Sequence, residues 1–136
     1  MKLNLMLLPD ARSILKQQIF LKDAIKQWGN IAGLVAGLEQ GNYELIGRSL
    51  EDVLIEPTRS ILIPAFDQVK KISKELGALG GGISGSGPSI FMLSTNEFTA
   101  KSVEIAMSQI YDSIGLSCHT YVTTINTNGI QLMDAS

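Results

Sequence analysis

Five of the eight residues from Gly80 to Gly87 are glycine, and Pro88 follows them directly. Glycine loses more conformational freedom on folding than any other residue, so it is expected where the backbone takes a positive φ or approaches another group closely. Backbone amides that no side chain shields also suit the binding of a phosphate or another anion. The sequence therefore predicts either an anion-binding loop or a tight glycine hairpin between two strands.

Two known phosphate-binding motifs share the spacing of these glycines but not their context. Gly80, Gly82 and Gly85 fit the letters G-x-G-x-x-G, but the dinucleotide fingerprint needs a strand before the loop and a helix after it. Here a helical pattern precedes the loop and an apolar, strand-like stretch follows it. The spacing of Gly82 and Gly87 fits a P-loop, but Pro88 stands where the phosphate-binding lysine belongs. The sequence therefore favours neither a Rossmann site nor a P-loop NTPase.

Size and composition narrow the classes of protein. A chain of 136 residues is long enough for one domain with a hydrophobic core, and a net charge of −2 without a basic patch argues against a nucleic-acid partner. The apolar stretch Leu5–Leu8 is too short to span a membrane and lacks the pattern of a signal peptide. A lone Cys118 and a single histidine leave no ligand set for zinc. We expect a cytoplasmic protein, since a lone cysteine fits a reducing compartment.

The first half of the chain has the periodicity of helices. Gly29, Gly33 and Gly37 recur every four residues on one face of the first helix. Each weakens the helix by about 1 kcal/mol relative to alanine, so close packing against a neighbour is the expected reason for them. Apolar residues at helical spacing, together with Gly41-Asn42, Pro64 and Gly77 as boundaries, predict helices over residues 23–40, 43–54 and 66–76.

The second half mixes strands with one helix. Asn128-Gly129 is a strong hairpin signal between the last two strands. Helices followed by strand, strand, helix, strand and strand predict an α+β fold, a ferredoxin-like sandwich whose antiparallel four-stranded sheet has helices packed on one face. Besides the glycine run, the elements predicted are a strand over 89–93, a helix over 97–114, and strands over 119–125 and 130–133.

The chain shows no complete catalytic set of residues. Cys118 and His119 are adjacent in a predicted strand, so their side chains point to opposite faces and a Cys–His pair is disfavoured. Arg12 stands at the start of the first helical segment, and Arg59 lies in the predicted turn after Glu56-Pro57. A guanidinium group can bind a carboxylate or phosphate with two parallel hydrogen bonds, although a solvated surface charge is the alternative for either arginine.

Three motifs together resemble one family. They are Gly82–Phe91, the segment Glu56-Pro57-Thr58-Arg59, and the segment 10–15, which reads Asp-Ala-Arg-Ser-Ile-Leu. In this order and spacing they resemble the C-terminal half of the homoserine kinases, which belong to the GHMP small-molecule kinases. The resemblance indicates a GHMP kinase C-terminal domain over residues 10–136 and leaves residues 1–9 as a start segment, either a strand remnant or a divergent beginning.

The resemblance implies an activity for the whole enzyme. Homoserine kinases transfer a phosphoryl group from Mg-ATP to the side-chain hydroxyl of L-homoserine in threonine biosynthesis, and they are commonly homodimers. It implies that Arg12 and Arg59 bind the substrate carboxylate. It also implies that a glycine-rich loop lines the cleft to the N-terminal ATP-binding domain; the residues of that loop are Gly80, Gly81, Gly82, Ser84, Gly85, Ser86 and Gly87.

The chain lacks the parts that the family supplies from its N-terminal domain. It has no ATP phosphate loop and no counterpart of the acidic and asparagine residues of that domain. We therefore expect no catalytic residue, no bound ATP or Mg²⁺ and no kinase activity in this chain alone. A non-catalytic ferredoxin-like ligand-binding, regulatory or dimerisation domain is the alternative. Convergence of Arg12 and Arg59 on one cleft beside the glycine loop would favour the kinase.

Overall fold

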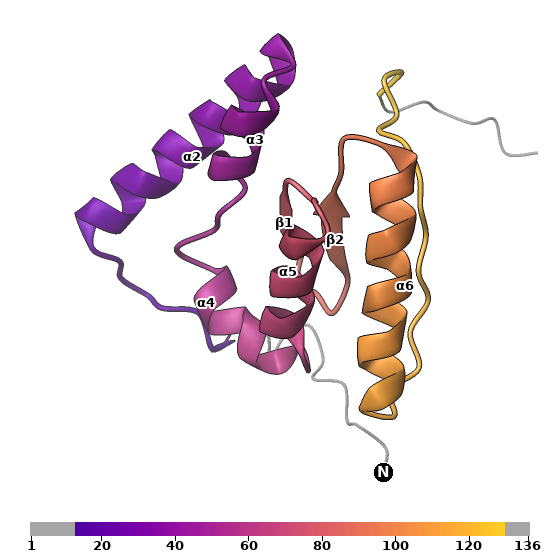
Figure 1. The fold of residues 1–136 in the computed structure, drawn as a ribbon. Coiled ribbons are helices and arrows are strands. Elements are labelled where there is room, and N and C mark those ends of the chain that lie inside the picture. The colour runs from indigo at the N-terminus through magenta and orange to yellow at the C-terminus, as the bar shows by residue number, and fades with distance from the viewer. Residues whose placement is uncertain (1–12, 130–136) are drawn as a thin grey trace, which may run out of the picture.

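The computed structural model describes residues 13–129. Figure 1 shows a helical hairpin on one side of the molecule and a two-stranded sheet packed against two helices on the other. The elements in chain order are the helices α2 (Leu21–Gln40), α3 (Tyr43–Ser49) and α4 (Glu56–Arg59), the 3-10 turn η1 (Ser60–Leu62), helix α5 (Phe66–Glu75), strands β1 (Gly80–Ile83) and β2 (Ile90–Leu93), and helix α6 (Glu97–Ser113).

Local signals set the turn between α2 and α3. Gly41 ends α2 in the left-handed conformation, with φ 63°, where glycine has no steric penalty. The side chain of Asn42 then accepts a hydrogen bond from the amide of Leu45 at 3.0 Å and begins α3. The predicted helix over 43–54 is too long, because α3 ends at Ser49. The residues after it turn instead toward the side chain of Asp52, which accepts the amides of Leu54 and Ile55.

Two of the three spaced glycines in α2 allow α3 to approach closely. A Cβ at Gly33 would lie 2.5 Å from the Ser49 hydroxyl oxygen, and a Cβ at Gly37 would lie 2.9 Å from Ile46 Cγ1. Gly29 has no heavy atom within 4 Å of its Cβ position among the described residues. The expectation of close packing is therefore confirmed for Gly33 and Gly37 and is wrong for Gly29 within this part of the chain.

Alanine at these positions should have opposite effects. Gly37→Ala is expected to destabilise the fold by about 1–3 kcal/mol, because its methyl group would press on the backbone nitrogen of Ile46, at 3.0 Å. Gly29→Ala, the control in the same helix, should stabilise it by up to about 1 kcal/mol through helix propensity alone. Urea unfolding followed by circular dichroism measures both. Equal shifts of the same sign would contradict the packing argument.

The hydrophobic core lies between the sheet and the helix pair α5 and α6. Strands β1 and β2 are antiparallel, with Gly80 opposite Leu93 and Ile83 opposite Ile90. Val69 of α5 packs with residues of α6 that are also buried, and side chains of β2 cover this cluster from the sheet. The prediction of an antiparallel sheet with helices on one face is confirmed. The core cluster consists of Val69, Ile110 and Tyr111, with Ile90, Met92 and Met107 among the residues packed on it.

The predicted four-stranded sheet is seen here only in part. Within residues 13–129 the sheet has two strands, β1 and β2. Residues 119–125, predicted as a strand, run back along α6 as an extended segment without strand pairing (Figure 1). A β-strand is defined by a hydrogen-bonded neighbour, and no described strand lies along this one. The last predicted strand, over 130–133, is outside the described residues. In the part of the chain that is described, no helix is long and apolar enough to cross a membrane.

Candidate functional site

The glycine run forms a hairpin rather than a row of free amides. Gly80, Gly81 and Gly82 are buried in β1, so the hairpin alternative of the sequence analysis is confirmed. A Cβ at Gly81 would overlap the carbonyl oxygen of Phe91 and lie 2.7 Å from the sulfur of Met92. These glycines are therefore needed for close contact between strands. Because the backbone of Gly80–Gly82 is packed inside the protein, the anion-binding alternative concerns the turn 84–87, where it stays a prediction.

The turn that follows β1 is held by its own backbone. The amide of Ser84 donates to the carbonyl of Ser89 at 2.8 Å, and the amide of Gly87 donates to the carbonyl of Ser84 at 3.1 Å. Gly85 and Gly87 have φ values of 62° and 76°, which residues other than glycine rarely adopt. In this geometry the carbonyl of Gly85 points toward Arg59 of α4.

Arg59 is the buried cation of this site. It is the last residue of α4, is only 8% exposed, and its Nη1 donates to the carbonyl oxygen of Gly85 at 3.2 Å. Its Nε is buried and has no hydrogen-bond partner among the described residues. A buried guanidinium with an unused donor is costly unless a further acceptor completes it. The pairing of Arg59 with the glycine turn fits the binding of a small anion.

The other predicted arginine cannot be placed beside it. Arg12 lies outside the described residues, so the convergence of Arg12 and Arg59 on one cleft stays a prediction. Arg59 does line a groove together with Ser86 and Gly87 of the glycine turn. Of the predicted site residues, the structure therefore brings Arg59 and the 84–87 turn together, whereas Gly80–Gly82 support them from within the sheet.

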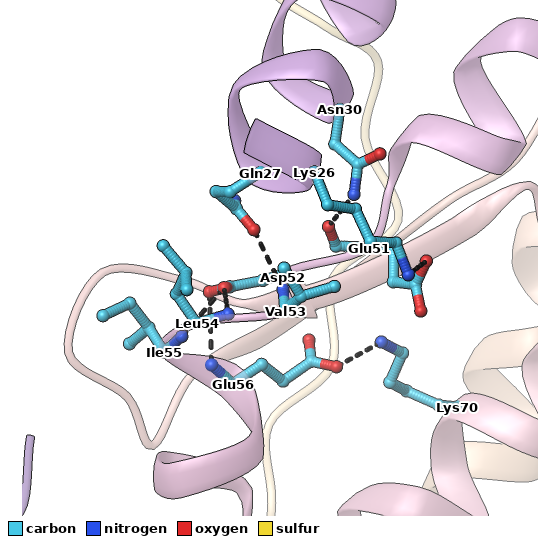
Figure 2. A network of polar contacts seen from close by, with 10 residues as sticks. All are labelled: Lys26, Gln27, Asn30, Glu51, Asp52, Val53, Leu54, Ile55, Glu56 and Lys70. Carbon is cyan, nitrogen blue, oxygen red and sulfur yellow. Dashed lines mark hydrogen bonds and ion pairs between the residues drawn. The ribbon is translucent and has the colours of Figure 1, made fainter. Parts of the chain in front are cut away.

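The start of α4 is fixed by the carboxylate of Asp52 (Figure 2). One oxygen accepts the amides of Leu54 and Ile55, each at 2.9 Å, and the other accepts the amide of Glu56 at 3.2 Å. These are amides that have no partner within the helix, and aspartate is a preferred residue for capping them. Asp52 was not among the residues predicted from the sequence, although an aspartate shortly before a Pro-containing helix start is a recognisable capping signal.

Helix α2 holds the same loop from the other side, as Figure 2 shows. The side-chain oxygen of Gln27 accepts the amide of Val53 at 2.9 Å, and Asn30 Nδ2 donates to the carbonyl of Glu51 at 2.7 Å. An exposed ion pair at 3.1 Å joins Lys26 to Glu51. The position of α4, and with it that of Arg59, therefore depends on contacts with α2 between residues 21 and 26 positions apart.

A shielded ion pair connects α4 to α5. Lys70 Nζ lies 2.5 Å from Glu56 Oε1, and their side chains are 18% and 13% exposed. The other oxygen of Glu56 lies 2.9 Å from the position that a Cβ on Gly82 would occupy. Helices α4 and α5 and strand β1 therefore come together at Glu56, which lies one helical turn before Arg59. Lys70 was not among the residues predicted from the sequence, because nothing in the sequence indicates which residue a side chain of α5 will contact.

The described residues contain no cluster suited to a metal ion. No group of three or more His, Cys, Asp or Glu side chains in residues 13–129 could hold one. Cys118 and His119 are exposed in the extended segment after α6.

A family model and the relatives of known name place this chain in the same family. Residues 34–113 match the family model of the GHMP kinase C-terminal domain. A homoserine kinase of Chloroherpeton thalassium is 52% identical over 104 residues, which are 76% of this chain and 33% of that protein. A homoserine kinase of Pyrococcus furiosus is 41% identical over 116 residues, which are 85% of this chain and 39% of that protein.

A solved structure agrees with these relatives. The crystal structure of homoserine kinase from Cytophaga hutchinsonii superposes with a TM-score of 0.84 at 52% identity, over 87% of this chain and 38% of that one. This chain therefore spans only 33% of the length of the Chloroherpeton relative and 39% of the Pyrococcus relative. On the family model and these matches, the chain belongs to the GHMP kinase C-terminal family.

Proposed function

We propose that residues 10–136 are the C-terminal, substrate-binding part of a homoserine kinase, which transfers a phosphoryl group from ATP to L-homoserine. The observation that carries the proposal is the buried Arg59, whose Nη1 is held by the carbonyl of Gly85 while its Nε lacks a partner among the described residues. The relatives named homoserine kinase, at 52% and 41% identity, support the choice of substrate.

Arg59 would bind the α-carboxylate of homoserine. Hydrogen bonds between a guanidinium and a carboxylate are charge-assisted and directional, so they fix which end of the amino acid faces the donor. Arg12 is proposed as the second cation on that carboxylate. Phosphoryl transfer depends mainly on positioning and charge stabilisation, so holding the acceptor hydroxyl in line is a substantial contribution. Mg-ATP, bound by the other part of the enzyme, supplies the phosphoryl group.

The exposed face of α2 is proposed as the docking surface for the N-terminal ATP-binding part. Apolar side chains lie along it at helical spacing, and Trp28, near its middle, is 60% exposed. Large exposed apolar patches usually mark interaction sites. We also propose that the assembled enzyme is cytoplasmic and forms a homodimer. The residues of this face are Leu21, Ile25, Trp28, Ile31, Val35 and Leu38.

A chimaeric enzyme tests the function. Residues 10–136 would replace the aligned C-terminal region of the Chloroherpeton thalassium homoserine kinase, and ADP release would be measured with and without L-homoserine. We expect homoserine-dependent turnover in the chimaera and none in this chain alone. A folded chimaera that binds homoserine without turning it over would support the non-catalytic alternative. Turnover by the isolated chain would contradict the proposal that ATP is bound by the other part of the enzyme.

Replacing Arg59 should raise the KM for homoserine far more than replacing another arginine of the same domain. In the chimaera, Arg59→Ala is expected to raise the KM for homoserine by roughly 10–150-fold, which corresponds to about 1.5–3 kcal/mol for a hydrogen bond to a charged group. Arg48→Ala, at an exposed position on α3, is the matched control and should leave KM within about twofold. Steady-state kinetics measure the KM of both variants, and similar KM values would exclude Arg59 from the substrate site.

A further inference from the structure

Glu56 and Arg59 carry opposite charges on the same short helix, yet they are bound to different groups. Both belong to α4, and residues three positions apart on a helix are neighbours whose side chains can form an ion pair. In the structure, however, the Glu56 carboxylate pairs with Lys70 of α5, and Arg59 donates to the carbonyl of Gly85. The carboxylate closest to Arg59 along the helix is therefore engaged by another cation.

Contacts on two sides hold the Glu56 carboxylate in this place. Figure 2 shows the side chain extending from α4 toward Lys70. The ammonium of Lys70 also lies 5.6 Å from the centre of the Phe66 ring, a cation–π contact that orients it. On the other side, the second oxygen of Glu56 lies 2.9 Å from the position that a Cβ on Gly82 would occupy. The carboxylate thus occupies the space that the glycine leaves beside β1.

The donors of Arg59 would be taken if that carboxylate turned toward them. Only Nη1 has a hydrogen bond to a backbone carbonyl, and the buried Nε has no partner among the described residues. A carboxylate is a stronger acceptor for a guanidinium than a backbone carbonyl, and it can accept two of its N–H groups at once. A Glu56 side chain without Lys70 would therefore compete directly with any anion that binds to Arg59.

We propose that Lys70 is a positioning residue of the substrate site: it keeps the Glu56 carboxylate paired and so leaves Arg59 available for the substrate carboxylate. The inference rests on the proposed function of Arg59. Without Lys70, Glu56 would be a shielded charge without a cation, which is costly, and Arg59 is the buried cation of its own helix. Lys74 lines the same surface hollow as Glu56 but is exposed, so it is a weak substitute. Turning to Arg59 removes the carboxylate from Gly82, so it recovers only part of the lost stability.

The kinetics of the chimaera distinguish this role from that of a structural anchor. Lys70→Met should raise the KM for homoserine roughly tenfold, because Glu56 then occupies Arg59. The kcat and the KM for ATP should stay within about twofold, since only binding of the acceptor is weakened. Adding Glu56→Gln to Lys70→Met removes the competing charge and should bring the KM for homoserine back to within about threefold of the unaltered chimaera. A mere anchor predicts no such recovery, because the double variant still lacks the ion pair.

Further variants at the two lysines control for folding and for charge. Lys70→Arg keeps a cation and should keep the KM for homoserine within about threefold. Lys70→Gln, which is neutral but polar, gives the same test if Lys70→Met does not fold. Lys71→Met, which removes a lysine that is 76% exposed, should leave the KM within about twofold. An unchanged KM in folded Lys70→Met or Lys70→Gln, or a double variant no better than Lys70→Met, would overturn the proposal.

The Nε–Hε NMR signal of Arg59 in the full chain reports the contact without substrate or turnover. Its loss in Arg59→Lys assigns it. We expect the proton signal to move downfield in Lys70→Met, because a carboxylate becomes its acceptor, and to return when Glu56→Gln is added. The same position in all three proteins would overturn the proposal. A chimaera that does not turn over homoserine would instead contradict the proposed function, and the NMR signal would still show whether Lys70 keeps Glu56 from Arg59.

Discussion

Gly81→Ala is expected to destabilise the fold by about 3 kcal/mol or more, at the upper end of the range for overpacked sites. The new methyl group would overlap the carbonyl oxygen of Phe91 and lie 2.9 Å from Met92 Cα, so the two strands would have to separate. Rotamer changes cannot relieve this clash, because backbone atoms form it. Thermal and urea unfolding of the chain measure the loss.

Gly85→Ala is the matched control for that result. Gly85 also has an unusual backbone conformation, with φ 62°, but nothing lies within 4 Å of its Cβ position among the described residues. Alanine there should cost only about 1–2 kcal/mol for the left-handed conformation. If both variants lose the same stability, conformational freedom rather than close strand contact explains the glycine run.

Lys70→Met is expected to cost about 3–5 kcal/mol, because it leaves the carboxylate of Glu56 shielded and without its cation. Both side chains of the pair are less than one-fifth exposed, so solvent screens the interaction only weakly. Lys71→Met, at the next position, removes a lysine that is 76% exposed and 3.9 Å from Glu75. That exposed pair contributes about 0–1 kcal/mol, so the control should change stability little.

A double-mutant cycle separates the pair from the effect of burying a charge. Glu56→Met combined with Lys70→Met should recover much of the stability that Lys70→Met loses, because no unpaired charge remains. The free energy of unfolding of all four proteins gives the coupling between the two side chains. A double variant that is as unstable as the sum of both single variants would show that packing of each chain, and not the ion pair, holds α4 to α5.

The Glu56–Lys70 pair illustrates what the sequence could not predict, whereas the Asp52 cap had a local signal that was missed. Asp52 and Lys70 were not recognised from the sequence. Asp52 accepts a hydrogen bond from the amide of Glu56, and Lys70 pairs with the Glu56 side chain, so both fix the start of α4, the helix that carries Arg59. Arg59 was recognised from its motif, and the structure places it beside the glycine turn as expected. The partner proposed for it, Arg12, lies outside the described residues, so the convergence of the two arginines stays a prediction.

The sequence by itself determined the elements whose signals are local. Helical periodicity and the left-handed Gly41 are set by interactions within a few residues, so α2, α5 and α6 could be recognised directly. The dense glycine run left two alternatives, an anion-binding loop and a hairpin, and the structure shows the hairpin. The motifs likewise indicated the kinase family. Only the tertiary structure decided which glycines are packed, where α3 ends and what surrounds Arg59. The surroundings of Arg59 depend on contacts such as Glu56 with Lys70 and Arg59 with Gly85, which are 14 and 26 positions apart, and packing rather than local propensity selects them.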